Sequence, residues 1–227
     1  MSNVKTSRIV ALMFLLITSG CGREVADQIV ATRDSSPPTE AAGAPAPPNS
    51  AHGAEVHHFD DLDAMVATAE AVVIGRVVET RRGPVLGDPG FELTLREVVI
   101  EVEDLLTGEA PPRLVQYELG WSSNGAATEA NNVAGSAVGD RGFYFLAPAE
   151  GRDDLVQPSF ILLNSQGRYL TEDGETLTPA NSDDAFSNEL ASRGFAGLQA
   201  AVRDSAERVK AGEATPASTA PPRSNQS

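Results

Sequence analysis

Apolar residues follow two different spacings along the middle of the chain, and together these predict a mainly β domain with helices at both ends. Between residues 60 and 70, apolar side chains recur every three or four positions, which predicts a short helix. Residues 184–210 show the same spacing over a longer stretch, and Gly194 divides it into two. Between these helices, apolar or alternating runs predict strands at residues 71–78, 91–106, 114–121, 142–146, 159–163 and 168–170.

The second of these predicted strands changes the phase of its alternation. Leu93 and Leu95 have one parity, whereas Val98 and Ile100 have the other. Because the side chains of a strand alternate between its two faces, this change predicts an extra residue, a β-bulge, near residues 96–97. Bulges bend a sheet toward closure, so the strands predict a small closed or partly closed barrel.

The flanks of this region differ from it in composition. Residues 22–54 and 211–227 are rich in Ala, Pro and Ser and hold few large aliphatic residues, so we expect both to be solvated and disordered. The predicted organisation is a signal peptide at 1–20, a lipidated cysteine and tether at 21–55, one domain at 56–210 and a disordered tail at 211–227.

The N-terminal residues have the three parts of a secretory signal. Lys5 and Arg8 precede a short apolar run at residues 9–17, and small residues then lead to Cys21. The run is shorter than the roughly 20 residues of a membrane-spanning helix. This segment resembles the lipobox of bacterial lipoproteins, with Thr18 where an aliphatic residue is usual. The resemblance implies lipidation of Cys21 and anchoring at the cell membrane or outer membrane, and a plain secretory signal with a free thiol is the alternative.

Charge and cysteine content narrow the range of partners. The chain has 17 Lys and Arg against 32 Asp and Glu, a formal net charge of −15. Such a surface repels phosphate backbones and anionic headgroups, so we expect no nucleic-acid partner. Cys21 is the single cysteine, and the domain therefore has no internal disulfide and depends on core packing.

Three segments of the predicted domain carry a further resemblance: AEAVVIGRV at residues 69–77, VVIEVEDLLTG at 98–108 and GDRGFYFL at 139–146. Together they resemble a group of uncharacterised bacterial exported domains, similar in pattern to the OB-fold barrel of netrin and tissue metalloproteinase inhibitor domains. The resemblance spans roughly residues 62–170 and implies an OB-like barrel with a short N-terminal helix and a C-terminal helical region. Thr107 stands where Lys is common. The inhibitors use disulfides and an N-terminal cysteine at the zinc of their target, and the domain has neither, so their mechanism is not implied.

His57 and His58, followed by Asp60, Asp61 and Asp63, are the best candidate for a metal site, because imidazoles and carboxylates together suit a zinc-type ion. Adjacent side chains diverge in most backbone conformations, however, and acidic residues also stabilise the start of a helix. We favour the helix-start interpretation and predict no metal. No nucleotide, haem or iron–sulfur motif is present, and we predict no cofactor.

Residues 122–139 form an unusually long predicted connection between two strands. Connections in compact domains are usually about 4–6 residues, and those beyond roughly 12–15 are commonly functional or disordered. Trp121 stands at its base, where a large ring with one N–H donor suits either a plug at the end of the barrel or a platform for a ligand. The candidate contacts for a ligand or partner are Trp121, Ser122, Ser123, Asn131 and Asn132.

These features predict an exported, membrane-tethered lipoprotein that acts as a binding or interaction module for an envelope protein or a small ligand. Two alternatives stay open: a structural or assembly accessory of the cell envelope, and a hydrolase without a recognisable motif. The predicted domain has only two histidines, no cysteine and no clustered acid/base motif, which favours a non-enzymatic role.

Overall fold

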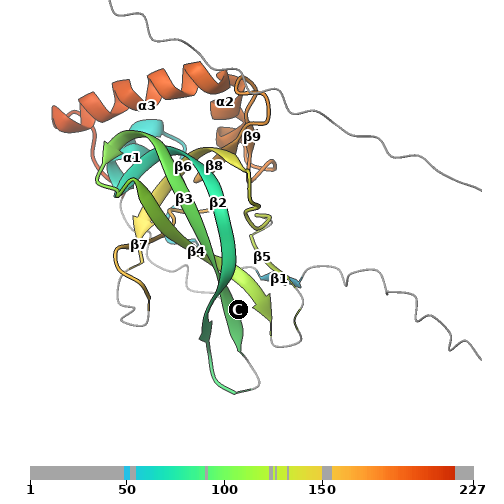
Figure 1. Ribbon diagram of the computed structural model, residues 1–227. Helices are drawn as coiled ribbons and strands as arrows, with labels where there is room; N and C mark the ends of the chain where they lie inside the picture. The colour runs from blue at the N-terminus through green and yellow to red at the C-terminus, as the bar shows by residue number, and fades with distance from the viewer. Residues whose placement is uncertain are drawn as a thin grey trace, which may run out of the picture. The chain divides into compact units, whose positions relative to one another are not determined.

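The computed structural model describes residues 49–51, 55–89, 92–122, 125, 127–131, 133–149 and 155–217. The predicted signal peptide, Cys21, most of the predicted tether and residues 218–227 lie outside these ranges. The described chain is mainly β (Figure 1), with the elements β1 Asn49–Ala51, α1 Leu62–Thr68, β2 Ala71–Leu86, β3 Leu93–Gly108, β4 Arg113–Ser122, β5 Thr128–Ala130, β6 Arg141–Pro148, β7 Ser159–Leu162, β8 Arg168–Leu170, β9 Thr178–Pro179, α2 Ala185–Ser192 and α3 Gly194–Lys210.

Seven strands form one mixed sheet in the order β2-β3-β4-β7-β6-β8-β9, while β1 and β5 form a separate parallel pair. Because β2 also pairs with β6, the pairings run through β2, β3, β4, β7 and β6 and return to β2. In this ring β4 and β7 are parallel, and the other neighbours are antiparallel. The predicted mainly β fold is confirmed, with a partly ring-like closure through five strands.

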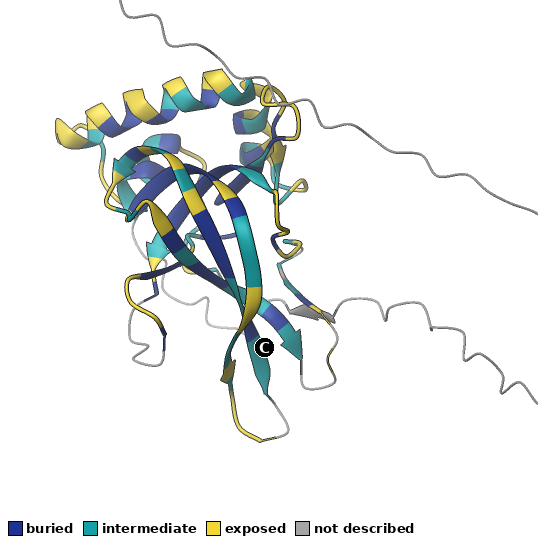
Figure 2. Cartoon of the chain, in the orientation of Figure 1, coloured by how far each residue is buried: buried dark blue, intermediate teal, exposed yellow. Residues whose placement is uncertain are grey.

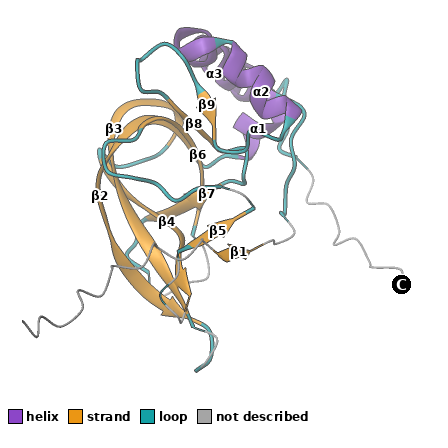
Figure 3. Ribbon diagram, turned by 90° about the vertical axis from the view of Figure 1, so that its right-hand side faces the viewer, coloured by secondary structure: helices purple, strands orange, loops and turns teal. Residues whose placement is uncertain are grey.

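The helices begin and divide where the sequence indicates. Asp61 caps α1, because its carboxylate accepts hydrogen bonds from the backbone N–H groups of Asp63 and Ala64. Gly194 separates α2 from α3 with a φ of 68°, a left-handed conformation that favours glycine. All three helices gather at one end of the strands (Figures 1 and 3). None of the helices in the described part of the chain combines the length and apolar character needed to span a bilayer.

The central strands are buried on both faces, which explains their nearly continuous apolar sequences (Figure 2). One face packs against the helices, and its members from β2 and β6 are Val72, Ile74, Phe143 and Phe145. The opposite face holds a second cluster to which every strand of the ring contributes: Val73, Val77, Val98, Ile100, Leu114, Tyr144 and Phe160. The ring therefore encloses a packed apolar interior.

The bulge predicted near residues 96–97 is wrong in position. Pairing between β3 and β4 is continuous from Leu95 to Glu101. Extra residues lie in the partner strands, at Val78 of β2 and Gly120 of β4, and farther along β3 at Glu103 and Leu106. The phase change has another cause, because Leu95 and Val98 both become buried, in clusters on opposite faces of β3. A Cβ atom on Gly120 would lie 2.6 Å from the Thr94 carbonyl oxygen, so the bulge needs glycine.

The strand β2 is also longer than predicted. It continues beyond the predicted end at residue 78, through Gly83 and Pro84, two residue types typical of turns, to Leu86. Its register against β3 shifts between Arg82 and Val85, so the irregularity absorbs the two residues that would otherwise end the strand. Pairing with β3 thus overrides the local turn signal.

Candidate ligand cavity

A cavity of about 440 Å³ lies where β4 and β7 stop pairing. These strands pair only at Val115 with Ser159 and at Gln116 with Phe160. Beyond Gln116, residues of β4 line the cavity together with residues 133–135 and 161–165. Its walls are mostly apolar, and its volume is within the range of about 300–1,000 Å³ typical of small-molecule sites.

Gln116 is the unusual member of this wall. Its side chain is 0% exposed and lies in register between Val98 of β3 and Phe160 of β7. Neither Oε1 nor Nε2 has a hydrogen-bond partner among the described residues. A buried polar group without a partner costs about 1–3 kcal/mol, so this amide lowers the stability of the folded chain.

A buried ion cluster supports the same wall. The Glu118 carboxylate lies 3.8 Å from Arg168 Nη1 and 3.6 Å from Arg96 Nε, and the side chains of Arg168 and Glu118 are 3% and 13% exposed. Ser136 donates to Glu118 from its backbone N–H (2.8 Å) and its hydroxyl (3.1 Å). Burial raises the pKa of Glu118, although Arg168, Ser136 and Arg96 act in the opposite direction.

The same cluster fixes the loop that faces β4. Arg168 donates from Nη1 to the Ser136 hydroxyl at 2.7 Å and from Nη2 to the Ala134 carbonyl oxygen. Arg96 Nη1 donates to the Ser136 carbonyl oxygen at 3.0 Å. Because Ala134 and Gly135 line the cavity, these bonds set the position of its outer wall.

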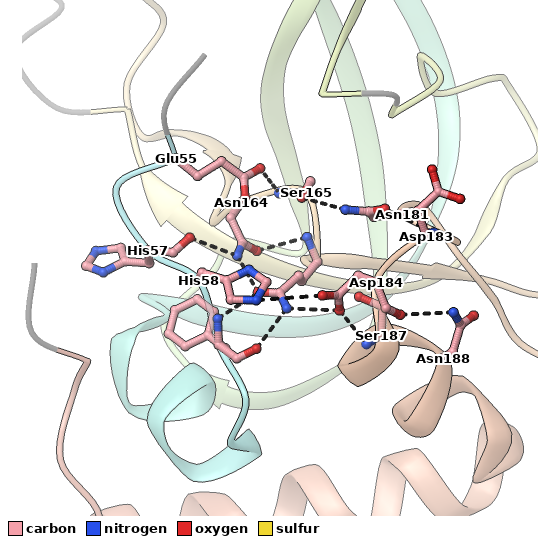
Figure 4. Close-up of polar contacts among 12 residues, drawn as sticks. Glu55, His57, His58, Asn164, Ser165, Asn181, Asp183, Asp184, Ser187 and Asn188 are labelled. Atoms are coloured by element: carbon pink, nitrogen blue, oxygen red, sulfur yellow. Dashed lines mark hydrogen bonds and ion pairs between the residues drawn. The ribbon is translucent and has the colours of Figure 1, made fainter. Parts of the chain in front are cut away.

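The segment that precedes α1 completes the edge of the cavity. The Glu55 carboxylate accepts hydrogen bonds from Asn131 Nδ2 (3.1 Å) and from the backbone N–H of Ser165 (2.8 Å). In Figure 4, Glu55 reaches toward Ser165. Val56 and Ile161 also line the cavity and are exposed, so its rim presents apolar side chains to solvent, a feature of ligand grooves.

Next to this edge lies a fully paired polar corner, centred on Gln166. Its Oε1 accepts from the Phe59 backbone N–H (2.8 Å) and Asn164 Nδ2 (2.7 Å), and its Nε2 donates to the Phe59 carbonyl (2.8 Å) and Asp184 Oδ2 (3.0 Å). Asp184 also caps α2 by accepting from the Ser187 backbone N–H (Figure 4). Burial alone would raise the pKa of Asp184, but these hydrogen bonds outweigh it and lower the pKa.

The candidate ligand contacts predicted at the long connection lie in two places, at the cavity and at the end of β4. Asn131 lines the cavity, whereas Trp121 and Ser122 close β4 outside its lining. The guanidinium groups of Arg96 and Arg82 lie 4.9 and 5.1 Å from the centre of the Trp121 ring, as cation–π contacts. Ser123 and Asn132 lie outside the described residues.

Two of the acidic residues near α1, Asp61 and Asp63, have structural partners. Besides Asp61 at the cap, Asp63 forms an ion pair with Arg208, whose hydrogen bonds lower the pKa of Asp63. His58 Nε2 lies 3.7 Å from Asp184 Oδ1. Within the described ranges, no group of three His, Cys, Asp or Glu side chains is placed to hold a metal ion.

A second hollow, of about 640 Å³, lies beside Arg141 and Asp173. Arg141 and Asp173 are paired within the chain: Arg141 Nε donates to Glu103 at 2.7 Å, and Asp173 accepts from the backbone N–H groups of Glu175 and Thr176. The cavity beside Gln116, whose walls are mostly apolar, is the stronger candidate for a small-molecule site.

Sequence reasoning missed Gln116, Glu118 and Arg168. Gln116 and Glu118 alternate with Val115, Tyr117 and Leu119, and such alternation is typical of a strand with one face in solvent. Only pairings between segments distant in sequence show that the ring also covers the polar face of β4.

No protein-family model matches the chain, and no curated protein matches it.

Proposed function

We propose that the protein is an exported, lipid-anchored binding module whose ligand occupies the cavity beside Gln116. The observation that carries the proposal is the cavity itself, which holds about 440 Å³ between mostly apolar walls and opens at a rim where Val56 and Ile161 are exposed. Its volume and its apolar lining are typical of a small-molecule site.

The proposed architecture is an OB-like barrel. Its support is the ring of five strands β2-β3-β4-β7-β6, which has the strand number of that fold. OB-folds bind ligands on the face of their second and third strands and on the loops after the first and fourth strands. The cavity is lined by Leu95 and Leu119 of β3 and β4, by Leu86 at the end of β2, and by Ala149 and Leu155 after β6.

A neutral fluorophore, N-phenyl-1-naphthylamine, provides the test of the cavity. We expect saturable binding with one site per chain. Ala134→Phe, which places a ring at the cavity wall, should weaken that binding roughly tenfold or more. Ala137→Phe is the matched control, because Ala137 is an exposed alanine of the same loop and does not line the cavity. The proposal fails if the dye shows no saturable binding, or if the two variants weaken it equally.

The proposed anchor rests on the N-terminal sequence and has its own test. Two acyl chains hold a protein stably on a membrane, so the wild-type protein should sediment with membranes after a high-salt wash. Cys21→Ser removes the thiol that would carry the lipid and should move the protein to the soluble exported fraction. A variant that stays on the membrane through the wash contradicts lipidation at Cys21.

A further inference from the structure

Glu55 places a carboxylate at the rim of the cavity. Both of its hydrogen bonds, from Asn131 Nδ2 and from the Ser165 backbone N–H, go to Oε1, and no described residue donates to Oε2. We infer that the cavity takes an amphiphilic organic cation, whose ammonium group pairs with Glu55 at the rim while its apolar body lies inside. This inference rests on the proposed function and adds the chemical class of the ligand.

The turn after β7 holds Glu55 in position. The backbone N–H of Ser165 donates to its carboxylate at 2.8 Å, and Asn164 Nδ2 donates to the carbonyl oxygen of His57 at 3.2 Å (Figure 4). Both donors therefore fix the segment in which Glu55 lies. A carboxylate that is already ordered loses little conformational freedom when a ligand binds, so this arrangement favours binding.

The surroundings of Glu55 supply no opposite charge. Glu118, the other acidic residue of the lining, has Arg96 and Arg168 at 3.6 and 3.8 Å. The two donors to Glu55 are neutral, and none of the described residues that line the cavity is Lys or Arg. An anion would meet like charge at this rim, whereas a cation would gain a charge-assisted hydrogen bond. The net charge of −15 also favours the approach of a cation.

The inner walls fit an apolar body attached to the ammonium group. Leucines from three strands and from the segment after β6 line the cavity: Leu86, Leu95, Leu119 and Leu155. Val56, next to Glu55 in the chain, also lines it and is 62% exposed, so the apolar surface continues to the carboxylate. Apolar contact thus supplies affinity, while Glu55 selects the sign of the charge.

The test uses three compounds of nearly equal shape: 4-phenylbutylamine, 4-phenylbutan-1-ol and 4-phenylbutanoate. Each competes with N-phenyl-1-naphthylamine for the full-length Cys21→Ser protein near pH 7, where the amine and the acid are charged. The serine replaces the thiol that would carry lipid, so no acyl chain takes up the dye. We expect the amine to bind roughly tenfold more tightly than the alcohol, because charge-assisted hydrogen bonds are about twice as strong as neutral ones, and the acid to bind most weakly. Added salt should narrow the gap between amine and alcohol.

Variants locate this preference at Glu55. Glu55→Gln keeps an acceptor for Ser165 but removes the charge, so the amine should bind within about twofold of the alcohol. Glu55→Ala gives a second route if glutamine perturbs folding. Glu109→Gln, the same change at an exposed carboxylate outside the lining, is the matched control and should keep the preference.

The inference is overturned if the alcohol or the acid binds as tightly as the amine, if both Glu55 variants keep the preference, or if Glu109→Gln loses it to the same extent. Dye binding that persists in those cases leaves the proposed function standing, whereas its absence removes both.

Discussion

Two buried glutamines, Gln166 in the turn after β7 and Gln116 in β4, have opposite hydrogen-bonding surroundings. Gln166, 1% exposed, uses both side-chain atoms in four hydrogen bonds that join the segment before α1, the turn after β7 and the cap of α2. Gln116, 0% exposed, has none among the described residues. The residue type and the burial are the same, so the difference lies in what each neighbourhood supplies.

The comparison separates a group that stabilises the fold from one that adds an unrelieved cost to it. At Gln166, removing the amide leaves backbone and side-chain groups without partners, and each such buried group carries a cost. At Gln116, the cost is already present in the folded protein.

The largest expected effect tests whether the Glu118 cluster, which supports the wall beside Gln116, is part of the buried structure. Arg168→Met removes the most buried cation from the Glu118 cluster and releases the loop bonds to Ala134 and Ser136. We expect the free energy of unfolding to fall by about 3 kcal/mol, because Glu118 stays buried with less compensation. Urea denaturation measures it. Arg203→Met, which breaks an exposed pair with Asp104, should cost under about 1 kcal/mol, and equal losses would contradict the assignment of the cluster as buried structure.

The second expected effect addresses the paired corner directly. Gln166→Leu leaves the Phe59 backbone groups, Asn164 and Asp184 without their common partner. We expect a loss of about 2–3 kcal/mol in the free energy of unfolding. The same change at Gln199, whose single bond to Asp104 is partly exposed, should have a much smaller effect. A loss at Gln166 no greater than at Gln199 would break the comparison.

The third expected effect is that the carboxyl groups of Asp184 and Glu118 change the stability of the fold with pH in opposite directions. The lowered pKa of Asp184 gives stability that is present above its unfolded pKa and lost as the pH falls through the folded one. The raised pKa of Glu118 gives stability that is present below its unfolded pKa and lost as the pH rises through the folded one. Asp184→Asn should therefore lower stability by up to about 1 kcal/mol near neutral pH, with the difference vanishing in acid.

Unfolding curves measured between neutral pH and acid test both carboxyl groups. Glu118→Gln should remove a contribution to stability that declines toward neutral pH. The difference in free energy of unfolding between this variant and the wild type should therefore change with pH in the opposite direction from that of Asp184→Asn. If both variants respond to pH with the same sign, the two neighbourhoods do not differ electrostatically in the way that their contacts indicate.

Local features of the fold were predictable from the sequence, and pairings between distant segments were not. Asp61 caps α1 through bonds to residues two and three positions away, and Gly194 divides the C-terminal helices by its own backbone conformation. Both depend on near neighbours. The continuation of β2 through Gly83 and Pro84 depends instead on β3, which supplies the pairing that a local turn signal cannot anticipate.

The candidate site was less accessible to sequence reasoning for the same reason. Asn131, named because of the long connection, does line the cavity. Gln116 and Glu118 occupy alternate positions of β4, and a polar residue in such a position has the same pattern whether its face meets solvent or the interior of a ring. The partners that distinguish the two cases, Ser136 and Arg168, lie far along the chain.

The smallest expected effect is the most informative about Gln116. Gln116→Leu replaces two unpaired buried atoms by apolar ones of similar volume, so the free energy of unfolding should stay unchanged or rise by up to about 1 kcal/mol in the absence of ligand. Gln166→Leu, the same substitution at equal burial, should lower it, and the opposite signs are the direct measure of the difference between the two regions. Urea denaturation of both variants beside the wild type provides the measurement. A loss of 2 kcal/mol or more at Gln116, on the order of that expected at Gln166, would mean that its amide has partners within the folded chain.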